Sequence, residues 1–234
     1  MFLPRTLLDS FDTAHHMFTV SSYKQNIRRL VGALLPFTMM GSLCAQDINE
    51  PFSYPTGLLD APATLTTPVG NTARIGKPKI ILESTKLADL ADLTGATRLS
   101  EGRDAFRRDT LCLTGTDHGK PVIAWFIATD SEYVTEAQLA WVKNQHVPEF
   151  CRRLPPERLP IQLGKIGLGM TQAEVQDLLG PASSQDTSGW HYWFSQRFLR
   201  NDRGLQELEL NWLAVRFDQN GLVSQAFISQ VTNL

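Results

Sequence analysis

The chain has 234 residues, of which 42% are hydrophobic and 20% are charged, a balance that excludes a wholly disordered protein. The formal net charge of −2 gives no basic surplus for nucleic acid and no acidic tail for a basic partner. Three cysteines are too few for a small scaffold held together by disulfides.

The N-terminal residues 1–45 have the layout of a secretory signal peptide. Lys24, Arg28 and Arg29 precede the uncharged residues 30–45, which are too short to span a hydrocarbon core of ~30 Å. A basic region, a short apolar stretch and small residues before a cleavage site are typical of an exported protein. A core helix is the alternative interpretation of residues 30–45.

Two details of this signal stay open in the sequence. Translation starts at Met1 or at Met17, and Met17 gives the more ordinary signal length. Cleavage after Ala45 releases a soluble chain beginning at Gln46. Acylation of Cys44 gives a lipoprotein instead, although Leu43 is larger than the residue expected just before a lipidated cysteine.

Cleavage after Ala45 leaves two cysteines, Cys112 and Cys151. Two cysteines in an oxidising compartment usually pair, so we predict a disulfide that closes a loop of about 40 residues. The alternative is a pair of free thiols, or a nucleophile beside a histidine.

The remaining chain is expected to contain a linker and two similar halves. Residues 46–78 are rich in proline and threonine, which predicts an extended linker, with irregular structure packed on the domain surface as an equal alternative. Residues 79–155 and 156–234 each carry a short helical pattern followed by strand patterns. The fold class predicted is α+β, with short helices packed on an antiparallel sheet in two degenerate tandem units.

The first half repeats the pattern loosely. Residues 85–93 have leucines every third position before a glycine, which predicts a short helix. Residues 110–114 and 121–129 are strand candidates joined by a turn. Residues 132–142 fit a strand or a helix, and we favour a strand.

The second half gives clearer signals. Thr171 and Glu174 form a capping box ahead of a helix over residues 172–179, which Gly180 and Pro181 end. Residues 190–194 and 205–217 are strand candidates, the latter alternating apolar and polar side chains. Asp218 to Gly221 is a hairpin turn signal before the last strand, residues 222–228.

These motifs resemble the BamE (SmpA/OmlA) family over roughly residues 161–229. The resemblance rests on the Gly169-Met-Thr helix start, the Leu-Gly-Pro helix end at residue 181, the aromatic run 190–194, the Phe217-Asp pair and the Asn220-Gly hairpin. It implies an architecture like that of beta-lactamase inhibitor protein, and a non-enzymatic protein of the cell envelope. The poor lipidation signal, the additional half 79–155 and a basic loop over residues 195–205 depart from that family.

The aromatic run also supplies the candidate interaction surface. Strand alternation places residues 190, 192 and 194 on one face and His191 and Trp193 on the other. One face must lie in the core, and exposed aromatics mark protein contacts. Core packing is the favoured interpretation of these aromatics, and a binding surface is the alternative, for which we name His191, Trp193 and Trp212 as candidate interaction residues.

No motif in the sequence supplies catalytic chemistry. The glycines of residues 164–169 lack the complete dinucleotide or Walker pattern, no G-x-S-x-G elbow occurs, and the histidine spacing offers no metal ligands. We therefore expect no enzyme activity, no cofactor and no metal, with His118 or His191 as the general base if the protein is an enzyme after all.

The sequence thus predicts an exported envelope protein, periplasmic or associated with the outer membrane, that acts as an interaction or assembly module. Its partner is expected to be another envelope protein and not nucleic acid. A lipid anchor or that partner would bring it to the membrane. The alternative is an inhibitor or binder of an exported enzyme.

Overall fold

The structure is a computed structural model that describes residue 51 and residues 69–142, 147–200 and 202–233. These residues form an α+β fold with two short helices and two antiparallel sheets. In chain order the helices and strands are β1 (Thr72–Ile75), β2 (Lys79–Ile81), α1 (Leu87–Thr94), β3 (Arg98–Glu101), β4 (Arg108–Asp117), β5 (Lys120–Thr129), β6 (Glu136–Trp141), β7 (Arg152–Arg153), β8 (Ile161–Leu163), β9 (Ile166–Gly167), α2 (Gln172–Leu179), β10 (Ser184–Gln185), β11 (Trp190–Arg200), β12 (Gln206–Phe217) and β13 (Val223–Asn233).

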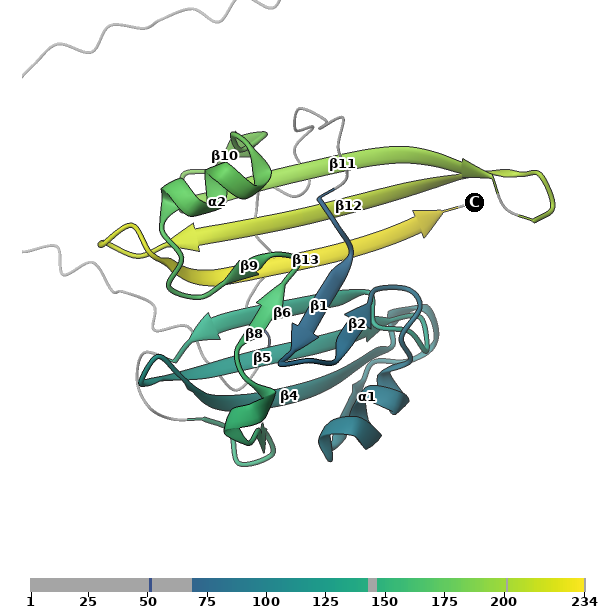
Figure 1. The fold of residues 1–234 in the computed structure, drawn as a ribbon. Coiled ribbons are helices and arrows are strands. Elements are labelled where there is room, and N and C mark those ends of the chain that lie inside the picture. The colour runs from purple at the N-terminus through teal and green to yellow at the C-terminus, as the bar shows by residue number, and fades with distance from the viewer. Residues whose placement is uncertain (1–50, 52–68, 143–146, 201, 234) are drawn as a thin grey trace, which may run out of the picture. The chain divides into compact units, whose positions relative to one another are not determined.

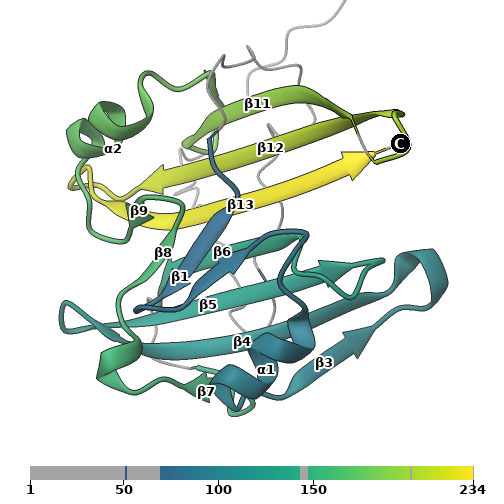
Figure 2. The same ribbon diagram turned by 45° about the vertical axis from the view of Figure 1, so that its right-hand side comes forward.

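The large sheet has the strand order β10-β11-β12-β13-β6-β5-β4-β3, and β7 lies parallel to β4 at the β3 end. The small sheet has the order β2-β1-β8-β9. Figures 1 and 2 show the small sheet and both helices on the same side of the large sheet. We call this side the helix-covered face of the large sheet, and the other side the opposite face.

The main hydrophobic core fills the space between the two sheets and the helices. It includes Leu87 and Leu90 of α1 and Val175 of α2, together with Phe126 and Trp193 of the large sheet. A second buried cluster, which contains Trp125 and Phe227, lies on the opposite face. Alternating side chains of one sheet thus supply two cores, so both faces of its central strands are apolar.

The linker expected over residues 46–78 ends earlier than the sequence indicated. Residues 46–50 and 52–68 lie outside the described part of the chain, but Thr72–Ile75 is β1 of the small sheet. Ala73 and Ile75 are fully buried while Arg74 is exposed, as expected for a strand with one face in the core. Strand β1 pairs with the nearby β2 on one side and with β8, which is distant in sequence, on the other, and the proline and threonine content of the segment gave no sign of either pairing.

The predicted helices are confirmed. Helix α2 spans Gln172–Leu179, and both hydrogen bonds of the Thr171 capping box are present. Helix α1 spans Leu87–Thr94 and ends at Gly95, whose φ of 68° is left-handed. The ambiguous segment 132–142 contains a strand, β6, as favoured.

The prediction of a basic loop over residues 195–205 is wrong for residues 195–200, which belong to a strand. Strand β11 continues through Arg200 and pairs with β12 in an unbroken register from Trp190↔Arg216 to Arg200↔Gln206. The pattern misled because the outer part of β11 is polar and rich in arginine. Its conformation is set by pairing with β12, which the local sequence does not reveal.

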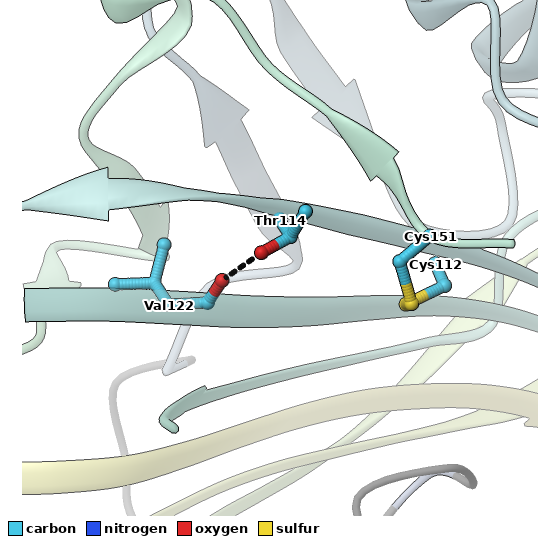
Figure 3. The surroundings of a disulfide bond; sticks show 4 residues. All are labelled: Cys112, Thr114, Val122 and Cys151. Carbon is cyan, nitrogen blue, oxygen red and sulfur yellow. Dashed lines mark hydrogen bonds between the residues drawn. A yellow bond between two sulfur atoms is a disulfide. The ribbon is translucent and has the colours of Figure 1, made fainter. Parts of the chain in front are cut away.

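The predicted cysteine pair is joined in the structure. The Sγ atoms of Cys112 on β4 and Cys151 just before β7 are bonded, and the two Cα atoms lie 4.6 Å apart (Figure 3). Next to them, Leu113 of β4 pairs with Arg152 of β7. The Thr114 hydroxyl donates to the Val122 carbonyl at 2.8 Å, which links β4 to β5. The disulfide therefore holds the segment between the two halves against the edge of the sheet.

The order of elements repeats along the chain. A β-hairpin, a helix, a short edge strand and three long strands occur first as β1 to β6 and then as β8 to β13. The two sets meet where β6 pairs with β13 and where β1 pairs with β8. The signal expected over residues 1–45 lies outside the described residues. Among the described helices, none is long and apolar enough to cross a membrane.

Candidate functional site: an apolar surface on the second half

The outer ends of β11, β12 and β13 carry an apolar surface on the opposite face of the large sheet. Phe198 of β11 faces Leu208 of β12, and Leu210 of β12 faces Val231 of β13. Phe198 is 65% exposed and Val231 is 36% exposed, while the two leucines are half-buried. We call these four residues, together with Trp212, the hairpin patch.

Trp212 connects the hairpin patch to the buried part of the sheet. Its ring lies 5.2 Å from the ring of Phe194, measured between centroids, and Phe194 is buried. Trp212 itself is half-buried. The hairpin patch therefore extends the buried apolar cluster of the opposite face outward along the paired strands, to where its side chains become exposed to solvent.

On the helix-covered face the same strands are polar. The Glu209 carboxylate accepts hydrogen bonds from Arg197 at 2.5 and 2.9 Å, from Asn211 at 2.8 Å and from Gln230 at 3.2 Å. Glu209 is only 3% exposed. Burial alone raises the pKa of this carboxyl, but the hydrogen bonds from Arg197 and Asn211 and the charge of Arg197 hold it below its ordinary value.

Glu83 extends this polar cluster to the first half of the chain. Its carboxylate accepts hydrogen bonds from the Gln230 amide at 2.8 Å and from the Thr232 backbone N–H at 2.8 Å and hydroxyl at 2.6 Å. Glu83 lies between β2 and α1. The cluster therefore ties β13 to the first half through charge-assisted hydrogen bonds.

In the outer part of β12 the usual burial pattern of a surface strand is reversed: the polar side chains are buried and the apolar ones are partly exposed. Glu209 and Asn211 point inward and are buried, whereas Leu208, Leu210 and Trp212 point toward the opposite face and stay partly accessible. A contiguous exposed apolar surface is typical of interaction sites, and here it lies on strands whose other face is polar. This arrangement can bind another macromolecule, but it offers no reactive group.

Residues 160–226 match the family model of the outer membrane protein assembly factor BamE domain. The second half of this chain is therefore similar to a BamE domain over those residues, and we call it the BamE-like domain. No curated protein and no solved structure matched the chain.

The match covers β8 to the first four residues of β13 and includes four of the five residues of the hairpin patch, all but Val231. The first half, β1 to β6, lies outside the match. The BamE-like domain is therefore the part of the molecule that carries both the family signature and most of the exposed apolar surface.

The candidate interaction residues do not come together in the BamE-like domain. Trp193 is 1% exposed, lies in the main core and donates its indole N–H to the Gly180 carbonyl at 3.1 Å, so naming it as a surface residue was wrong. His191 shares its face, is half-buried and packs edge-on against Phe217. Trp212 lies on the opposite face. Both faces of the aromatic strand are packed, which the alternation could not show.

The sequence missed Phe198 and Val231. The available signal was Phe198, a large apolar residue between two arginines in a segment interpreted as a solvated loop. The apolar side of β12 was recognised as a stripe, but the alternation does not say that this stripe is the exposed one.

The described residues hold no cluster of three or more His, Cys, Asp or Glu side chains able to bind a metal ion. His118 sits in the β4–β5 turn with 73% of its side chain exposed, and its Nδ1 lies 3.1 Å from Asp117. Burial lowers the pKa of His191, and the nearby Asp186 carboxylate opposes that shift. Neither histidine is positioned beside a nucleophile.

Proposed function

We propose that this protein is an exported, non-catalytic envelope protein that serves as an interaction or assembly module in outer-membrane organisation. The single observation that carries the proposal is the hairpin patch, an exposed apolar surface mostly within the BamE-like domain. The family match supports a role related to outer-membrane assembly. An apolar surface of this kind favours a macromolecular partner.

The proposal includes a periplasmic or outer-membrane-associated location and export through the signal at residues 1–45. It places the chain at the membrane through a lipid on Cys44 or through its partner, which is another envelope protein. The proposal also treats β1 to β6 and β8 to β13 as degenerate tandem units, because their element order repeats. The second unit is the BamE-like one.

The alternative, an inhibitor or binder of an exported enzyme, is less favoured. It depended on Trp193 as an exposed aromatic anchor, and Trp193 is buried. Phe198 is the aromatic side chain of the BamE-like domain that remains available for such a role.

The test is cross-linking in the native cells followed by purification of the tagged full-length chain. Proteins of the outer-membrane assembly machinery should be recovered with the wild type and lost with the double variant Phe198→Ser and Val231→Ser. Phe106→Ser is the matched control, because Phe106 is 87% exposed but lies in the first half, outside the match. Recovery of a single soluble hydrolase would support the alternative, and equal recovery with all three proteins would contradict a role for the patch.

A further inference from the structure

Among the residues that the structure describes, the outer edge of β11 has a neighbouring strand only near its start. Two of its eleven residues pair with β10, at Ser184↔Tyr192 and Gln185↔His191. Within the described part of the chain, no strand pairs with the outer side of β11 from Ser195 to Arg200. Figure 1 shows β10 beside only the start of β11, with the rest of that edge extending past it.

The hydrogen bonds near the start of β11 identify which residues face outward. The carbonyls of Trp190 and Tyr192 accept bonds from the preceding segment at 3.0 and 2.7 Å, and the Phe194 N–H donates to the Ser183 hydroxyl at 3.4 Å. Backbone groups alternate between the two sides of an antiparallel strand. The next residues whose N–H and C=O point outward are Gln196, Phe198 and Arg200.

Strand β4 is the first-half counterpart of β11, and its outer edge is covered by neighbouring strands. Four residues of β4 pair with β3, and two more pair with β7, which lies parallel beside its middle. Strand β7 is held there by the Cys112–Cys151 disulfide. In the first half, the short strand β7 thus covers the middle of β4. Among the described residues, no strand covers the middle of β11 in the same way.

The charges and the exposed aromatic residue at the edge of β11 indicate which kind of segment could bind there. Residues 195–205 contain three arginines and one aspartate, and Arg197 and Arg200 lie on the open stretch itself. The charge of Arg197 is compensated by its ion pair with Glu209, so Arg200 supplies the positive charge on the face that carries Phe198. Phe198 stands between the two arginines with 65% of its surface exposed. Positive charges along an open edge oppose pairing with a second copy of the same edge. Because side chains alternate between the two faces of a strand, Phe198 and Arg200 lie on the same face. They favour an extended segment with an apolar residue beside Phe198 and an acidic residue two positions away, beside Arg200.

We propose that β11 binds an extended acidic segment of a partner protein as an additional β-strand along Gln196–Arg200. The inference rests on the proposed function, because it states how the BamE-like domain would hold its partner. Backbone hydrogen bonds would supply affinity, and Phe198 with Arg200 would supply selectivity for the side chains of the added strand.

The test uses a synthetic peptide of about six residues, a usual strand length, in which a central valine has a glutamate two positions to either side, so that all three side chains lie on one face of the added strand. Binding to the full chain is followed by NMR, together with hydrogen exchange of the β11 amides. The amides of Gln196, Phe198 and Arg200 should exchange quickly in the free protein. They should slow by about tenfold or more with saturating peptide, whereas the inward amides of β11 are slow in both states.

The matched variants are Gln196→Pro and Gln196→Ala. Proline removes an outward N–H that β12 does not use, and proline is tolerated on edge strands for that reason. Gln196→Ala removes the same side chain but keeps the N–H. We expect the peptide to bind the wild type and Gln196→Ala alike and to bind Gln196→Pro at least about tenfold more weakly. Thermal melts check that both variants fold.

Other results would overturn the inference. These are no peptide binding up to about 1 mM, equal binding to Gln196→Pro, or peptide binding without slower exchange of the outward amides. A photo-cross-linker at position 198 that attaches to a second copy or to residues 46–68 of the same chain would also overturn it. If the peptide arm succeeds while no outer-membrane assembly protein is recovered from cells, the proposed function fails and strand addition stands. The reverse result refutes strand addition alone.

Discussion

Replacing both cysteines, Cys112→Ala with Cys151→Ala, should lower the free energy of unfolding by about 4 kcal/mol at 25 °C. The bonded residues are separated by 39 positions, and the chain-entropy relation for a closed loop of that length gives this value. Both side chains lie in the second buried cluster, with exposures of 1% and 8%. Alanine keeps those positions apolar, so the lost cross-link should dominate the change.

The assay is urea unfolding followed by tryptophan fluorescence. The midpoint of the double variant should move to a lower urea concentration. Its m-value should rise, because the unfolded chain without a cross-link exposes more surface. Reductant should destabilise the wild type toward the variant and leave the variant unchanged. A double variant within about 1 kcal/mol of the oxidised wild type would refute the loop-entropy reasoning.

Three further changes test the fold. Trp193→Ala should cost about 3–5 kcal/mol of stability, as for other large buried aromatics, whereas a surface role would leave the urea midpoint unchanged. Arg197→Ala should destabilise the protein at neutral pH, because Glu209 stays buried without its charged partner. The expected loss is roughly 1–3 kcal/mol, toward the lower end because the arginine is half-exposed and its charge is screened by solvent. The pKa of Glu209 is lowered in the folded protein, so this loss should be full above the ordinary carboxyl pKa of about 4.3 and fade as the pH falls below it; a loss constant from pH 7 to pH 3 would count against the pairing. Thr171→Ala should cost about 1 kcal/mol through the lost helix cap, and an unchanged thermal midpoint would argue against the cap.

Local signals predicted the helices well. The bounds of α2 follow from the capping box at Thr171 and the Gly180-Pro181 stop, which act within a few residues of the chain. The hairpin turn after β12 also follows locally, since the Asp218 carboxylate accepts the backbone N–H groups of Asn220 and Leu222 at 2.8 and 3.1 Å.

Features that depend on distant pairing could not be predicted. Strand β1 lies between the nearby β2 and the distant β8, where Ala73 pairs with Leu163, and its own residues resembled a linker. Strand β11 extends to Arg200 because β12 pairs with it throughout. Periodicity of two identifies the two faces of a strand but not which face is buried. This explains the misplacement of Trp193 and the reversed burial pattern at Glu209.

The two halves share an order of elements yet differ at their outer strands, and this difference separates their roles. Strand β4 has its edge covered by β3 and by the disulfide-held β7, so its backbone groups are used within the chain. Among the described residues, no strand pairs with most of the edge of β11, beside the exposed Phe198. We therefore expect the edge of the BamE-like domain to be available for a partner, with the first half stabilising the sheet from which β11 extends.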